Sequence, residues 1–139
     1  MLPAGHLDAV GKRVEFNSSC APVFVQRGGL AALAMADTFV PQLVGRLKAG
    51  RDALCPLLAV IPGVQSATPL GGMYAFFRVP GADDSLAFAK RLVADVGLGL
   101  APGAAFGDEG EGWLRWCFAS QDTARLVAGA ARLRDALRL

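Results

Sequence analysis

The sequence has few of the residues that build metal sites and disulfide frameworks. Its 139 residues include one histidine, His6, and three cysteines, Cys20, Cys55 and Cys117. The cysteines are odd in number and far apart, and together with His6 they match no zinc-binding spacing. We therefore predict no metal site and no disulfide framework, and we expect reduced, half-buried cysteines of the kind found in cytosolic proteins.

Long apolar runs and basic clusters are also absent from the sequence. The longest apolar runs fall short of the roughly 20 residues that span a bilayer, and no signal-peptide pattern opens the chain. The net charge is +2 without a basic cluster, which argues against nucleic acid or an anionic membrane as a partner. We predict a cytoplasmic chain with no membrane contact and the length of a single domain.

The first half of the sequence is helical in pattern. A short helical piece spans residues 6–14, and an Asn17-Ser18-Ser19 turn follows it. Residues 23–36 are apolar or small on nearly every face, so this helix is expected to be buried on all sides. A third, longer helix begins at the Asp37-Thr38 cap and is stopped by Pro62-Gly63. Since 53% of the residues are hydrophobic, part of the apolar surplus is expected to face a partner or a missing domain.

The second half alternates between strand and helix patterns. In order, the predicted elements are a strand over 71–79, a helix from Ser85 to Gly97, a short strand over 98–103, a loop, a strand over 113–119, and a last helix that starts at Ser120 or Asp122. This order predicts an α/β fold. We expect a two-layer α/β sandwich, a small and mainly antiparallel sheet with helices on one face, preceded by a long helix.

One arginine lies inside the strand predicted for residues 113–119. Side chains alternate between the two faces of a strand, so Leu114, Trp116 and Phe118 form the natural core face, and Arg115 points to the opposite face. A solvated arginine that extends past Trp113 is one interpretation. The other is a fork-shaped donor that binds a carboxylate from a rigid strand. Alternation alone does not decide between them.

The loop before this strand, GDEGEG, superficially resembles a phosphate-binding loop. Its acidic side chains would repel phosphate, and a strand follows it, whereas phosphates are bound at the amino termini of helices. We expect a flexible, solvated loop that moves when a cleft closes.

Four motifs in series resemble the carboxyl-terminal small domain of class I/II aminotransferases, the fold-type I enzymes that use pyridoxal phosphate. The matching residues are Gln26 in an Ala-rich helix, the Arg51-Asp52 pair, Pro69, Gly71, Gly72 and Tyr74 of a Pro-x-Gly-Gly-x-Tyr strand, and Pro102, Gly103, Phe106, Gly107, Gly112 and Arg115. The resemblance covers essentially the whole chain. It implies an enzyme that moves an amino group between an amino acid and a 2-oxo acid.

The resemblance also implies roles for single residues. Arg115 matches the arginine that holds the α-carboxylate of the substrate. Met73 and Tyr74 lie on a strand that approaches the substrate side chain, which makes them candidate pocket residues, but we favour core packing as the role of either. The turn at Asn17-Ser18-Ser19 resembles a segment near the dimer interface, so a homodimer is expected.

The main departure from the family is the missing Schiff-base lysine. The three lysines, Lys12, Lys48 and Lys90, stand outside the family's lysine context and read as solvated surface residues. The resemblance then implies a helical segment over 1–37, left from the large-domain or linker region, and a small domain over 38–139. We expect no catalytic, cofactor-binding or metal-binding residue, no pyridoxal phosphate bound by this chain alone, and no transamination by it.

Two other interpretations remain open. The chain could be a non-catalytic module, built from the same domain for dimerisation or for sensing a ligand. It could also be an unrelated two-layer sandwich in which Arg115 is a surface residue. The amino donor, the acceptor, and a lyase rather than an aminotransferase parent are not distinguished by any residue in the sequence.

Overall fold

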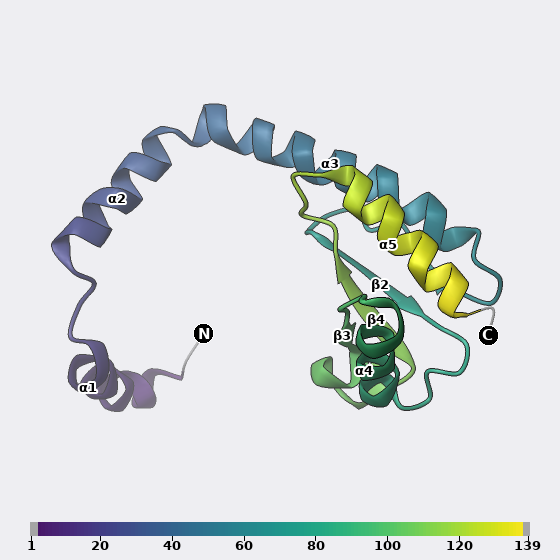
Figure 1. Ribbon diagram of the computed structural model, residues 1–139. Coiled ribbons are helices and arrows are strands. Elements are labelled where there is room, and N and C mark those ends of the chain that lie inside the picture. Colours follow the sequence, from purple (N-terminus) through teal and green to yellow (C-terminus); the bar gives the residue numbers. More distant parts are fainter. Residues whose placement is uncertain (1–2, 138–139) are drawn as a thin grey trace. The chain divides into compact units, whose positions relative to one another are not determined.

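The computed structural model describes residues 3–137 (Figure 1). The chain divides into two compact units, Met1–Pro41 and Gln42–Leu139, and the boundary falls within one helix, α3 (Ala36–Ala59). Each unit is described by itself below.

The first unit is helical throughout its regular structure. A 3-10 turn, η1 (Ala4–His6), leads into α1 (Leu7–Ser18), and α2 (Val23–Ala34) follows. The helix predicted for 6–14 therefore continues to Ser18, and the predicted turn is confined to Ser19, whose φ is 52°. Residue Met35 separates α2 from α3, so the predicted cap at Asp37 and Thr38 is wrong.

The expected enclosure of α2 is not observed. No residue of α1 or α2 is buried within the described part of the chain. Large apolar side chains on these helices are exposed, among them Phe16, Phe24, Leu30 and Leu33. A helix that is apolar on all faces is expected to be buried, but residues 3–137 do not provide a surface that covers α2.

The second unit contains a four-stranded sheet in the order β1-β2-β4-β3, in which every neighbouring pair is antiparallel. The two long strands, β2 (Tyr74–Arg78) and β4 (Trp113–Cys117), pair along their length and place Phe76 opposite Arg115. The edge strands β1 (Gln65–Ser66) and β3 (Ala101–Pro102) have two residues each. The strand predicted for 98–103 is thus shorter than expected, and β1 carries too little pattern for prediction.

Helices cover one face of this sheet, which confirms the predicted two-layer α/β arrangement. They are the second half of α3, α4 (Ser85–Val96) and α5 (Thr123–Ala136), and α5 runs beside α3 in Figure 1. A Cβ at Gly50 of α3 would press on the Phe118 carbonyl, and one at Gly129 of α5 would lie 2.7 Å from the Trp116 ring. Small residues therefore let both helices approach β4 closely.

The buried core lies between the helices and the sheet. As alternation predicts, Leu114, Trp116 and Phe118 of the β4 segment are buried there. The remaining core residues come from the three helices, from the residues just after α3 and α4, and from β2 and its flanks: Leu54, Cys55, Leu58, Ile61, Ala75, Phe77, Val79, Ala82, Phe88, Ala89, Leu92, Leu98, Leu126, Ala130 and Leu133.

The structure confirms the predicted amino-terminal cap of α5 but not that of α4. Asp122, one of the two residues predicted to start α5, caps this helix by accepting a hydrogen bond from Ala124 N at 2.9 Å. For α4 the predicted cap was Ser85, but Asp84 accepts from Ala87 N at 2.8 Å instead. Ser85 is the first helical residue and is fully buried, and Gly97 ends α4 in the left-handed conformation as predicted.

All three cysteines are free. Cys55 is buried and Cys20 and Cys117 are exposed, so the expected half-buried state is wrong for each of them. Burial raises the pKa of the Cys55 thiol.

Among residues 3–137, no single helix combines the length and apolar character needed to cross a membrane. Only α2 and α3 taken together would meet that requirement, by length and composition alone.

Candidate functional site

Arg115 lies at the centre of β4, on the face of the sheet that the helices leave open. Its two strand neighbours, Leu114 and Trp116, point into the core, whereas the Arg115 side chain is half-buried among aromatic rings. The Cζ atom is 3.8 Å from the centroid of the Phe106 ring and 4.3 Å from that of Tyr74. Both distances are within the range of cation–π attraction.

The aromatic rings of this face also contact one another. Phe76 stacks on Trp113 with ring centroids 5.3 Å apart and an interplanar angle of 6°. The Phe106 ring meets Phe76 edge to face, at 6.4 Å and 82°. Arg115 therefore contacts one end of this connected set of rings at Phe106, and it contacts a separate ring at Tyr74.

No carboxylate neutralises Arg115 among residues 3–137. The ion pairs in this part of the chain join Arg51 to Asp52 and Arg134 to Asp135, both on helices. The guanidinium carries N–H donors in a fork that matches a carboxylate with two parallel hydrogen bonds. The arrangement can therefore hold a carboxylate from outside the described residues.

The loop before β4 is exposed over most of its length, as expected, and hydrogen bonds at Glu111 anchor its end, whereas its predicted movement stays a prediction. It folds into two 3-10 turns, η2 (Gly103–Phe106) and η3 (Asp108–Gly110). The Glu111 carboxylate accepts hydrogen bonds from Ser85 N at 2.6 Å and Gly112 N at 3.0 Å. These hydrogen bonds, that from Ser85 foremost, hold the pKa of Glu111 below its ordinary value.

The two candidate pocket residues, Met73 and Tyr74, have different surroundings. Tyr74 contacts Arg115, as described above. Met73 lines a cavity of about 430 Å³ together with Lys48, Arg51 and Phe118. Met73 is 38% exposed and Tyr74 is 41% exposed, so neither residue is packed in the core.

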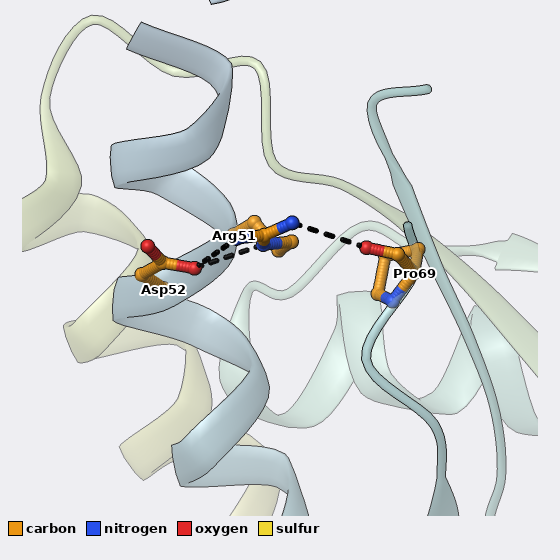
Figure 2. A network of polar contacts seen from close by, with 3 residues as sticks. All are labelled: Arg51, Asp52 and Pro69. Carbon is orange, nitrogen blue, oxygen red and sulfur yellow. Dashed lines mark hydrogen bonds and ion pairs between the residues drawn. The ribbon is translucent and has the colours of Figure 1, made fainter. Parts of the chain in front are cut away.

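The Arg51-Asp52 motif connects α3 to the segment that leads into β2. Arg51 pairs with Asp52 Oδ1 through Nη2 at 2.8 Å, and its Nη1 donates to the Pro69 carbonyl at 3.4 Å (Figure 2). Figure 2 shows the two contacts on opposite sides of the guanidinium. Because Asp52 is 52% exposed, the ion pair contributes at most about 1 kcal/mol. The contact from α3 to the segment before β2 is the hydrogen bond from Arg51 to the Pro69 carbonyl.

Sequence reasoning missed the contributions of Phe106 and Glu111. Phe106 was part of a matching motif, but strand alternation assigns no face to a residue in a turn. Glu111 is exposed, as expected for an acid of a solvated loop, but it also accepts a hydrogen bond from Ser85 N, 26 residues away in the sequence. The available signal for Phe106 was its place in the Pro-Gly-x-x-Phe-Gly pattern just before the arginine strand.

Comparisons with known proteins agree on one family. The family model "Aminotransferase class I and II" matches residues 6–133. An aspartate aminotransferase of Musicola paradisiaca is 33% identical over 81% of this chain, and an LL-diaminopimelate aminotransferase of Nitratidesulfovibrio vulgaris is 32% identical over 78%. The chain covers 29% and 28% of these two proteins, respectively.

Solved structures show the same likeness in three dimensions. The aspartate aminotransferase of Thermotoga maritima matches 95% of this chain and 33% of its own, with a TM-score of 0.80 and 30% identity. An aromatic aminotransferase of Pyrococcus horikoshii, at 23% identity, shares the fold with a TM-score of 0.85. The family model, the relatives and the solved structures thus agree, and the chain belongs to the class I and II aminotransferases.

Proposed function

We propose that this chain is the carboxyl-terminal part of a pyridoxal-phosphate-dependent aminotransferase, which transfers an amino group between an amino acid and a 2-oxo acid. In this proposal Arg115 binds the α-carboxylate of the substrate. The observation that carries it is a half-buried arginine on the open face of the sheet, in contact with two aromatic rings and with no carboxylate partner within residues 3–137.

The chemistry of Arg115 suits this role. The planar fork of a guanidinium binds both oxygens of a carboxylate at once. A strand backbone holds the fork in one place, so a bound substrate has a defined orientation. Such orientation lowers a reaction barrier by removing part of the entropy cost of bringing groups together.

Tyr74 is placed beside the substrate in this proposal because its ring contacts Arg115. For Met73 the supporting observation is weaker. It is exposed at the cavity beside Lys48 and Arg51, and a role in the substrate pocket stays a prediction.

Around Arg115, residues 3–137 do not provide the groups that would hold pyridoxal phosphate. A Schiff base with this cofactor requires a primary amine, and the two rings that contact Arg115, those of Tyr74 and Phe106, carry none. Lys12, Lys48 and Lys90 are exposed on α1, α3 and α4. We therefore derive no step through the cofactor. We propose that the chain by itself does not transaminate, and stoichiometric imine formation with pyridoxal phosphate at one of these lysines would contradict this.

The same proposal assigns the parts of the chain and its partners. Residues 1–37 would be a segment from the large-domain or linker region, and 38–139 the small domain. Exposed apolar side chains on α1 and α2, such as Phe16 and Phe24, support contact with further protein. We propose a homodimeric parent enzyme in the cytoplasm.

The role of Arg115 can be tested by titrating the chain with L-aspartate and following side-chain N–H signals by NMR. The wild type is expected to bind with the largest shifts at Arg115. Arg115→Lys keeps the charge and removes the fork, so a loss of about tenfold in affinity is expected, equal to about 1.4 kcal/mol.

Arg91 provides a matched control, since it is an exposed arginine whose Cζ lies 4.8 Å from the Phe88 ring. Arg91→Lys should bind L-aspartate like the wild type. Equal affinities for the wild type, Arg115→Lys and Arg91→Lys would contradict the proposed carboxylate site. Binding by this chain without activity is also what a non-catalytic ligand-sensing module would show.

A further inference from the structure

The ring of Phe106 is the closest aromatic contact of the Arg115 guanidinium. At 3.8 Å from Cζ to the ring centroid, the contact is tighter than the 4.3 Å contact with Tyr74. Tyr74 comes from β2 and Phe106 from the turn after β3, and these two strands flank β4 on opposite sides. The guanidinium therefore receives one ring from each side of its own strand.

These contacts leave the donors of Arg115 available. With Cζ only 3.8 Å from the Phe106 centroid, the ring lies against the flat face of the guanidinium, whereas the N–H groups point outward in its plane. A carboxylate approaches along that plane to make two parallel hydrogen bonds. Rings on the face and a carboxylate at the edge can therefore be held together without competition.

The turn that carries Phe106 is built to hold a fixed position. A Cβ on Gly103 would collide with the Gly110 carbonyl, and one on Gly110 would collide with the Gly103 carbonyl. Only glycines permit this approach of η2 to η3. The Ser85 hydroxyl, fully buried, accepts a hydrogen bond from Ala104 N at 3.2 Å.

A second anchor reaches the same turn from its far end. The Glu111 carboxylate bonds to Ser85 N at the start of α4, so one residue, Ser85, is linked to both ends of the segment. The Phe106 ring also rests edge-on against Phe76. The segment that carries Phe106 is thus bonded to α4 on both sides of the ring, at Ala104 and Glu111, and the Phe106 side chain contacts β2.

We propose that Phe106 is a positioning residue for Arg115, which holds the guanidinium in one orientation before a carboxylate binds. This inference rests on the proposed function, in which Arg115 is the carboxylate receptor. An arginine side chain that is already ordered loses less conformational entropy when its ligand binds. Phe106 thereby raises affinity for the carboxylate without touching it.

The test measures the order of the arginine side chains in the ligand-free chain. The order parameter of each arginine Nε–H bond is obtained from ¹⁵N relaxation, for the wild type, Phe106→Leu and Phe106→Tyr. Arg91, which contacts a single ring at 4.8 Å, is the internal reference in every sample. Because Phe106 is 48% exposed, the leucine variant is expected to fold, and its urea midpoint verifies this.

In the wild type, Arg115 should have a higher order parameter than Arg91. Phe106→Leu should lower the Arg115 value toward that of Arg91, leave Arg91 unchanged, and weaken L-aspartate binding three- to tenfold. Phe106→Tyr, which keeps a ring, should restore both quantities. A loss of fold would instead change the order of both arginines.

An unchanged Arg115 order parameter in Phe106→Leu would overturn the proposal, whatever its effect on affinity. A lowered order parameter with wild-type affinity would also overturn it, because the contact would then not assist binding. If the wild type itself fails to bind L-aspartate, the proposed carboxylate role fails. In that case the order parameters still decide whether Phe106 holds Arg115.

Discussion

The two faces of the small sheet use similar residues for different purposes. On the face under α3, α4 and α5, aromatic and aliphatic side chains such as Phe77 and Trp116 are enclosed and form the core. On the open face, Phe76 and Trp113 stack on one another beside Arg115 and remain partly exposed. Aromatic residues therefore form the buried core on one face of the sheet, and on the other face they form a partly exposed surface beside a charged side chain.

The physical difference between the faces is what lies above each of them. The helices exclude water from the first face, and the buried side chains there are hydrophobic apart from Ser85 at the start of α4. The second face has no covering layer among residues 42–137, so it tolerates a cation, provided that rings shield part of it. A strand between these environments must alternate strictly, and β4 does so with the burial pattern intermediate, buried, intermediate, buried, exposed.

Neighbouring phenylalanines of β2 provide the largest expected contrast. Phe77 is fully buried and Phe76 is 38% exposed. Phe77→Ala should lower the free energy of unfolding by about 3–5 kcal/mol through lost transfer energy and a cavity. Phe76→Ala should lower it by about 1 kcal/mol, the scale of an aromatic pair. Urea unfolding of both variants measures the difference.

Should Phe77→Ala not fold at all, Phe77→Leu leaves a smaller cavity and a measurable midpoint. Equal losses for the Phe76 and Phe77 variants would show that the two faces are not energetically distinct.

A smaller effect is expected in the turn that carries the Phe106 ring to the open face. In Gly103→Ala the new Cβ would meet the Gly110 carbonyl and lie 2.6 Å from the Trp113 carbonyl. Because backbone atoms cannot move aside cheaply, we expect a loss of about 1–3 kcal/mol in the free energy of unfolding. Gly99→Ala is the matched control, since nothing lies within 4 Å of its added Cβ. If the urea midpoints of Gly103→Ala and Gly99→Ala coincide, the close contact of η2 and η3 is contradicted.

The smallest expected effect is a pH dependence that comes from Glu111. Hydrogen bonds from Ser85 and Gly112 hold its pKa in the folded chain below the ordinary value of about 4.3. The stabilisation is complete above the unfolded-state pKa and is lost as the pH falls through the lower, folded-state pKa. The free energy of unfolding of the wild type should therefore decline more steeply below about pH 4.3 than that of Glu111→Gln. Parallel pH profiles for the two proteins would show that the carboxylate does not anchor the turn.

Much of the local structure could be predicted from the sequence. The helical stripe of α3, the strand faces of β2 and β4, the end of α4 at Gly97 and the cap at Asp122 depend on residues a few positions apart. Predictions failed where two adjacent residues both qualify, as with Asp84 and Ser85, or where a strand is too short to show a pattern, as with β1. The buried surroundings expected for α2 failed because the covering surface is not among the described residues.

The sequence by itself determined which side of the strand Arg115 points to, because side-chain direction in a strand depends only on the parity of neighbouring positions. Only the tertiary structure decided what Arg115 meets there. The Tyr74 and Phe106 rings lie 41 and 9 positions away in the chain, and they reach the guanidinium because β2 and β3 flank β4. Contacts of this kind depend on how strands pair and where turns are anchored, and no local periodicity encodes them.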